Sequence, residues 1–430
     1  MKKIIITCLT TGFFTLFASA QVSGTLSPYS QFGLGTLADQ SQGFNRGMNG
    51  LAIGLRDSRI ANMQNPASYS AIDSLTMVID AGVSGQLTNF KEGGKKLNRR
   101  TADFDYVTAV FRVMPKMGVS VGIVPFSNIG YSYYNVDNKS NSNLTATSTY
   151  SGTGGFSQAY IGVGWEVIKN LSVGANISYF WGDYSKSVVN VSNDSYAKTL
   201  TKTYSASVNS YKLDFGAQWQ HQLDKENLLT IGLTAGIGHN LGAQANLSSV
   251  TSESQNSTSF ESTDSVPDAF SLPYSFGVGA TLLHKNSLTV GADYTLQRWG
   301  ALDFPQVNDA TAHYGMGSGL LKDRHKVTLG LDWVPDAMSP RKFFRRVHYR
   351  MGASYVTPYY NIQGHDGPTE FSVSAGVGVP ILNTWNNRSV LNISAQWVHS
   401  SAKDFITENA FRINIGLTFN ERWFAKWKVD

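Results

Sequence analysis

The sequence is poor in cysteine and proline. Its 430 residues include a single cysteine, Cys8, and 12 prolines. Because Cys8 lies within an apolar stretch near the start, the rest of the chain can form neither a disulfide framework nor a cluster of thiolate ligands. A chain of this length can bury enough surface to fold without such covalent links.

Charge and long apolar runs are also scarce. Charged residues make up 15% of the chain and the formal net charge is +5, which is too small to indicate a nucleic-acid partner. After residue 20, no stretch approaches 18 consecutive apolar residues, and segments with clear helical periodicity are few. These absences exclude a helical membrane protein and argue against a mainly helical fold.

The first twenty residues have the features of a cleaved signal peptide. Lys2 and Lys3 precede an apolar stretch, and the segment ends in Ala18-Ser19-Ala20. We therefore expect residues 1–20 to be removed on export and the mature chain to begin at Gln21. Loss of the two lysines would lower the net charge from +5 to +3.

Apolar and small or polar residues alternate with period two along much of the chain. In 228–238, leucine and isoleucine alternate with threonine and glycine, and 287–297 repeats the pattern. The polar face is rich in glycine and poor in charge, unlike the charged outer face of a soluble sandwich. This pattern predicts an all-β, transmembrane antiparallel β-barrel whose apolar residues face lipid. A secreted β-rich adhesin is the alternative.

The breaks between alternating segments predict fourteen strands, an even number as expected for a bacterial barrel. They are placed near 74–90, 102–115, 117–135, 155–169, 171–185, 207–222, 228–242, 269–284, 287–301, 322–335, 345–359, 369–381, 388–401 and 409–420. Short connections alternate with long ones at 136–154, 186–206 and 243–268. The barrel is therefore assigned to residues 74–420, and residues 421–430 to a periplasmic aromatic and basic tail.

Residues 21–73 precede the first strand and are too apolar for a disordered leader. A barrel of fourteen strands is too wide for side chains alone to fill. We therefore predict that residues 21–73 form an N-terminal hatch, or plug, inside the lumen.

At this point the chain resembles the FadL/TodX family of outer-membrane transporters of long-chain fatty acids and hydrocarbons. The resemblance is carried by the run of small residues at 46–52, which includes Arg46, Gly47 and Gly50, by Asn65-Pro66-Ala67, and by the fourteen strands that follow. It implies a hatch inside the barrel, capture of a ligand from outside, and lateral exit into the bilayer through a gap at a distorted third strand.

Proline interrupts the predicted third strand. Pro125 removes a hydrogen-bond donor from the ladder, and Phe126, Asn128 and Gly130 follow it closely. Asn128 can bond to the backbone and Gly130 tolerates bulge geometry. The segment predicts a kink that opens the wall for lateral release, and an ordinary bulge near the rim is the simpler interpretation.

Strand phase places several charged residues on the lumen side, where charges must be paired or hydrated. The hatch supplies Arg56 and Arg59, with Arg46, as possible partners. Anchoring of the hatch by ion pairs is favoured over ligand binding. The wall residues in this set are Asp80, Glu166, Asp214, Asp293, Asp332, Arg350 and Arg412.

No motif indicates an enzyme, a metal site or a cofactor. The predicted function is passive uptake of hydrophobic small molecules across the bacterial outer membrane. Lipid and lipopolysaccharide are the expected surroundings, with no nucleic acid, and an outer-membrane or periplasmic protein partner is possible. The long loops are polar, whereas the family's loops present apolar surface. This departure keeps open the alternative of a barrel without transport activity that is a subunit of an outer-membrane secretion or assembly complex.

Overall fold

A computed structural model describes residues 27–74, 76–138, 145–194, 196–253, 258–308, 313–337, 339, 342–381 and 389–422. The predicted signal peptide, 1–20, lies outside these residues, as do positions 423–430 of the predicted tail. Among the described residues, no helix is both long enough and apolar enough to span a membrane.

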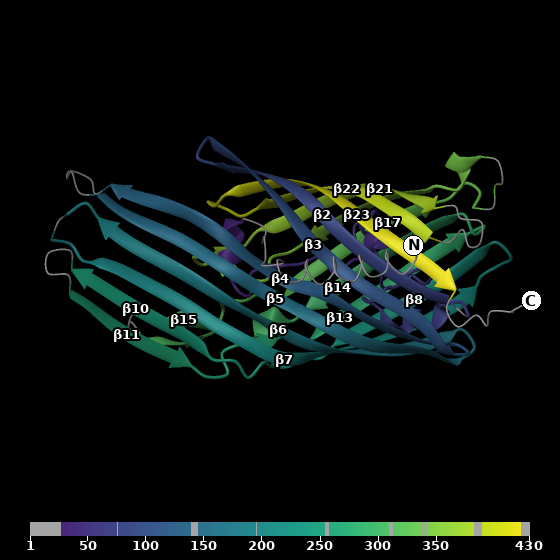
Figure 1. The fold of residues 1–430 in the computed structure, drawn as a ribbon, viewed down its shortest axis with the longest axis horizontal. Coiled ribbons are helices and arrows are strands. Elements are labelled where there is room, and N and C mark those ends of the chain that lie inside the picture. The colour runs from purple at the N-terminus through teal and green to yellow at the C-terminus, as the bar shows by residue number, and fades with distance from the viewer. Residues whose placement is uncertain are drawn as a thin grey trace, which may run out of the picture.

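The described residues form a closed antiparallel barrel of fourteen strands, as the sequence predicts (Figure 1). Each strand pairs with the next along the chain, and the last pairs with the first from Thr76↔Arg422 to Lys91↔Thr407. The wall strands are β2 (Thr76–Glu92), β3 (Lys95–Met114), β4 (Met117–Asn138), β5 (Thr145–Ile168), β6 (Leu171–Ser192), β7 (Thr199–Gln222), β8 (Asn227–Gly236), β13 (Ser275–His284), β14 (Leu288–Gln297), β17 (Arg324–Trp333), β18 (His348–Val356), β21 (Thr369–Ile381), β22 (Ser389–Ser401) and β23 (Thr407–Arg422).

Side chains alternate between the two faces of the wall. On β2, Ile79, Val83 and Leu87 are exposed on the outside, whereas Asp80 and Ser84 are buried on the inside. The same arrangement holds for the apolar residues of the other wall strands, such as Leu233 and Leu329. Apolar residues therefore face outward and polar ones inward, the reverse of a soluble β-sandwich.

The wall is taller on one side than the prediction allowed. The segments 136–154 and 186–206, expected to be loops, are largely strand. Strands β4 to β7 extend well beyond the part of the wall with exposed apolar side chains, which we call the apolar band. The expected loop 243–268 contains a hairpin, β10 (Ala245–Glu253) and β11 (Thr258–Val266), and β10 continues the sheet beside β7. These extensions are rich in Ser and Thr on both faces, so they lack the apolar alternation that marks a membrane-crossing strand.

Shorter elements connect the wall strands. Two-stranded pairs form between β9 (His239–Asn240) and β12 (Ser271–Leu272), between β15 (Phe304–Val307) and β16 (Tyr314–Gly317), and between β19 (Asn361–Ile362) and β20 (His365–Asp366). Single 3-10 turns, η3 (Trp299–Ala301) and η4 (Phe343–Arg345), lie in two of the connections.

The N-terminal segment, defined here as residues 27–74, contacts the wall on opposite sides. It contains η1 (Pro28–Gln31), β1 (Thr36–Leu37), α2 (Gly43–Arg46) and η2 (Pro66–Ala71). The turn η2 contacts β5, β6 and β7, whereas α2 contacts β22 and β23. Figure 1 shows the segment, in purple, among the strands of the wall.

Candidate functional site

The Asn65-Pro66-Ala67 motif forms the start of η2. The Asn65 side chain caps the turn by accepting a hydrogen bond from the Ala67 N–H, and Pro66 occupies the first turn, where it needs no donor. The Asn65 Nδ2 also donates to the Ile53 carbonyl, at 2.8 Å. The motif therefore fixes the shape of the N-terminal segment.

A row of wall glycines receives this turn. Gly164, Gly174 and Gly216 lie opposite one another on β5, β6 and β7. A Cβ atom added at Gly174 would lie 2.4 Å from the Pro66 carbonyl carbon, and one at Gly216 would lie 2.1 Å from the Asn65 side chain. The inward glycines predicted from alternation thus allow the backbone of the N-terminal segment to approach the wall.

Arg46 makes a direct ion pair between the N-terminal segment and the wall. Its Nη1 lies 2.7 Å from Oδ2 of Asp105 on β3 and 2.8 Å from Oδ1 of Asn414 on β23. The neighbouring Gly47 packs against Arg350, and Gly50 adopts a φ of +89°, which favours glycine. Asp105 was not among the predicted partners, because its strand is irregular at this point, where a bulge shifts the β2–β3 register.

Two of the predicted lumen charges contact the N-terminal segment directly. The Asp293 carboxylate accepts hydrogen bonds from the backbone N–H groups of Ala52 and Ile53, at 2.6 and 2.8 Å. The Arg350 guanidinium lies over the Phe44 ring, 3.9 Å from its centroid. Backbone donors and an aromatic face therefore supply contacts that the sequence analysis assigned to ion pairs.

The other predicted charges have different partners from those expected. Asp332 pairs with Arg350 and His348, and Asp80 accepts from the Tyr106 hydroxyl, all within the wall. Glu166 pairs with Lys116, Asp214 with Lys212, and Arg412 with Gln86. Within the N-terminal segment, Arg56 donates to Ala67 and Ser70, while Arg59 pairs with Asp57. Most of these partners are opposite one another on paired strands, two positions apart on one strand, or in an adjacent turn. Alternation within a single strand does not show which positions the paired strands bring together.

The wall separates at the predicted kink. Strands β3 and β4 pair only as far as Val107↔Ile123, just before Pro125. On the other side of β4, pairing with β5 continues but shifts by one residue between Pro125 and Ser127, which leaves Phe126 as the extra residue of a bulge.

The N-terminal segment takes the place of β3 beside β4. Strand β1 pairs antiparallel with it, with Thr36 opposite Asn128 and Leu37 opposite Ser127. The Ala38 N–H donates to the Phe126 carbonyl at 2.9 Å, and the Ser127 hydroxyl donates to Leu34 at 2.7 Å. Gly130 exchanges hydrogen bonds with Ser27 and Ser30. The edge that the kink exposes is thus hydrogen-bonded to the chain's own N-terminal residues.

An aromatic cluster packs the taller half of the interior. Phe180 makes an edge contact with Phe126 and stacks on Phe156, with ring centroids 5.0 and 5.6 Å apart. The cluster continues through Trp299 and Tyr359 to residues of η1. This part of the lumen is a packed core.

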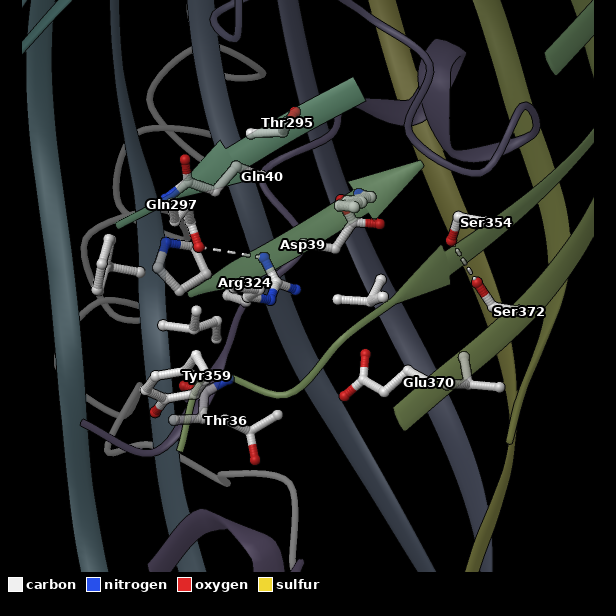
Figure 2. Close-up of a pocket in the computed structure, with 18 of the residues that line it drawn as sticks. Thr36, Asp39, Gln40, Thr295, Gln297, Arg324, Ser354, Tyr359, Glu370 and Ser372 are labelled. Atoms are coloured by element: carbon white, nitrogen blue, oxygen red, sulfur yellow. Dashed lines mark hydrogen bonds between the residues drawn. The ribbon is translucent and has the colours of Figure 1, made fainter. Parts of the chain in front are cut away.

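A polar cavity of about 330 Å³ lies between the N-terminal segment and the wall. Figure 2 shows Asp39, Gln297, Arg324 and Glu370 around it. Burial alone would raise the pKa of Asp39, but Lys326 and Arg46 nearby lower it to about 2. The charged residues that line the cavity are Asp39, Arg46, Asp103, Asp105, Lys212, Asp214, Arg324, Lys326, Glu370, Glu408 and Arg412.

The sequence analysis missed most of this set. Arg324, Lys326 and Glu370 lie at inward positions of β17 and β21, so strand phase could have identified them. No sequence pattern indicated that Asp39 would face the cavity, because its position follows from the path of the N-terminal segment. Within the described part of the chain, no group of three His, Cys, Asp or Glu residues could hold a metal ion.

Comparison with known proteins gives one family and a shared fold. A family model described as BamG matches residues 1–430. No curated protein matches the chain.

Solved structures of two toluene transporters and of a FadL homologue are similar in fold. The toluene transporter TbuX of Ralstonia pickettii is 14% identical, with a TM-score of 0.60, covering 90% of this chain and 99% of its own. The Pseudomonas putida toluene transporter TodX is 12% identical, with a TM-score of 0.59, covering 91% and 100%. A Pseudomonas aeruginosa FadL homologue is 11% identical, with a TM-score of 0.61, covering 92% and 99%.

Proposed function

The chain belongs to the BamG family, and from this premise we propose that it is an outer-membrane barrel that serves as a subunit of a secretion or assembly complex, without transport through its lumen. The hydrocarbon transporters share its fold at 11–14% identity, which does not carry their activity over. Its location in the outer membrane is supported by the fold and by the exposed apolar residues that surround the wall.

The observation that carries the proposal is the filled lumen. Sites for hydrophobic molecules are lined mainly by apolar side chains. Here the interior consists of a packed aromatic cluster and a cavity lined by eleven charged residues. An apolar molecule would have to displace the first and cross the second, and β1 closes the gap through which it would leave.

The parts that extend beyond the apolar band offer surface to a protein partner or to lipopolysaccharide. The sheet of β4 to β7 is extended by the β10–β11 hairpin, and the β2–β3 hairpin reaches out separately (Figure 1). The tip of that hairpin carries exposed basic residues suited to phosphate or carboxylate groups, namely Lys91, Lys95, Lys96, Arg99 and Arg100.

Isolation of the tagged chain from native outer membranes tests the proposal. We expect native mass spectrometry to show a defined complex with a fixed stoichiometry, and cells lacking the chain to take up radiolabelled toluene and oleate at the same rate as the parent. The β2–β3 tip variant with all five basic residues changed to Gln would report whether that surface holds the complex. A monomeric chain combined with reduced uptake in the deletion strain would overturn the proposal.

The second candidate is passive uptake of hydrophobic molecules with lateral release beside Pro125. It is favoured by the separation of β3 from β4 after Ile123 and by the position of Pro125, Phe126 and Asn128 at the cavity. In this function, the N-terminal segment would act as a hatch, and β1 would have to leave the β4 edge. A covalent link between β1 and β4, described in the Discussion, separates the two candidates.

A further inference from the structure

The charges around the polar cavity divide into paired and unpaired groups. Arg46 pairs with Asp105, and Lys212 pairs with Asp214. The first pair joins the N-terminal segment to the wall, the second lies within β7, and neither needs a further counter-ion. The other charged lining residues make no ion pair within 4 Å among the described residues, namely Asp39, Asp103, Arg324, Lys326, Glu370, Glu408 and Arg412. Of these, Arg324, Lys326 and Glu370 lie near one another on β17 and β21.

Arg324 has few hydrogen-bond partners. Its guanidinium has five donors, yet its one hydrogen bond to a described residue is a long one, 3.4 Å, to the Gln297 side chain. Figure 2 shows the guanidinium directed into the cavity, with Gln297 on one side and Asp39 on the other. Lys326 lies two residues along on the same strand, β17, and faces the same way.

An acidic group lies across the cavity from this cationic pair. Lys326 is opposite Val356 on β18, and Val356 is opposite Glu370 on β21, so the basic and acidic positions are two strands apart. Two strand spacings separate their backbones by about 10 Å, a gap that the side chains only partly span. Glu370 attracts the Arg324 guanidinium across this gap without contacting it.

We propose that this cavity binds a small zwitterion, of the size of a free amino acid or a dipeptide, with its carboxylate on Arg324 and Lys326 and its ammonium group on Glu370. The volume of about 330 Å³ admits a molecule of this size. A zwitterion satisfies both unpaired ends at once, whereas a simple anion would leave Glu370 without a partner. The site lies in the cavity whose charged lining also supports the proposed function, but binding of a zwitterion there does not depend on that function.

Equilibrium dialysis of the purified full-length protein against radiolabelled diglycine tests the inference, because dialysis allows time for slow entry into the lumen. We expect saturable binding of one diglycine per chain. Arg324→Gln and Glu370→Gln should each weaken it about tenfold or more, the effect of losing one charge-assisted hydrogen bond. Arg324→Lys, which keeps the charge, should restore most of the affinity.

The exposed Arg345 supplies the matched control, since Arg345→Gln makes the same charge change outside the cavity and should leave binding unchanged. Circular dichroism confirms that each variant is folded. Acetate and neutral N-acetylglycinamide should compete poorly. The inference is overturned by absence of saturable binding, by equal binding in folded Arg324→Gln, or by acetate competing as well as diglycine.

Discussion

At the scale of single residues, the contact between the N-terminal segment and the wall depends on atoms that are absent. Gly164, Gly174 and Gly216 leave room for the backbone of Asn65 and Pro66 to lie directly against the sheet. The close approach lets the Asn65 amide reach carbonyl groups of both the segment and the wall. A side chain at these positions would push the whole turn η2 away from the wall, because the Asn65 cap holds the turn in one shape.

Gly174→Ala should therefore displace η2 from the wall. The new Cβ would lie 2.4 Å from backbone atoms of Pro66, which cannot rotate away. We expect the free energy of unfolding to fall by about 1–3 kcal/mol, as for other overpacked cores, and cleavage of residues 27–74 by added protease to increase. Gly85→Ala is the matched control, because nothing lies within 4 Å of a Cβ added there. Equal stability of the two variants in urea titrations would contradict this account.

At the scale of elements, β1 is a short strand that completes a long wall. The backbone groups of β4 beyond Ile123 have lost β3 as a partner, and unpaired groups in a membrane wall cost several kcal/mol each. Pairing with Thr36 and Leu37 supplies part of what is missing. The two candidate functions differ in whether this two-residue strand must leave the β4 edge.

Leu37→Cys combined with Ser127→Cys should form a disulfide on mild oxidation. The two residues are directly opposite in a pair flanked by the Ala38–Phe126 hydrogen bond, which brings their Cβ atoms within disulfide reach. Mass spectrometry after alkylation measures the cross-link. Leu37→Cys with Tyr134→Cys is the control, because position 134 lies about 23 Å further along β4.

The cross-linked chain then tests transport. We expect toluene uptake by cells carrying it to be the same before and after reduction, because the proposed subunit does not pass hydrophobic molecules. Uptake that appears only on reduction would instead establish lateral release past β1.

The alternation of residues was enough to predict the fourteen strands, because it is a property of local sequence. Proline chemistry indicated an irregularity at Pro125, where the β4–β5 register shifts. The partners of the inward charges were harder to predict. Glu166 bonds to a lysine in an adjacent turn, and Asp293 bonds to backbone N–H groups that have no signature in sequence. The pairing of wall strands decides the first contact, and the path of the N-terminal segment along the wall decides the second.

At the scale of the whole molecule, the outer surface of the barrel is apolar, as in a membrane protein, and its interior is largely polar and buried. Leu233, Leu329 and Phe411 are exposed, whereas the lumen buries Asn, Ser and Arg side chains in hydrogen-bonded contacts. The apolar exterior needs lipid, and the interior holds the N-terminal segment, the aromatic cluster and the polar cavity. A barrel occupied in this way, with tall extensions on one side, suits a subunit whose partners bind outside the lumen.

Leu329→Arg tests the orientation of this exterior. Leu329 lies near the middle of the ten-residue strand β17, with 55% of its side chain exposed on the outer face. An arginine at the bilayer midplane should lower the free energy of unfolding by about 2–4 kcal/mol, measured by urea titration in lipid vesicles with tryptophan fluorescence. Tyr196→Arg, at an exposed position between β6 and β7, should change it by less than about 0.5 kcal/mol. Equal effects at the two sites would mean that the apolar band does not face lipid. Only an arginine immersed in hydrocarbon is penalised, and of the two positions only 329 is expected to be immersed.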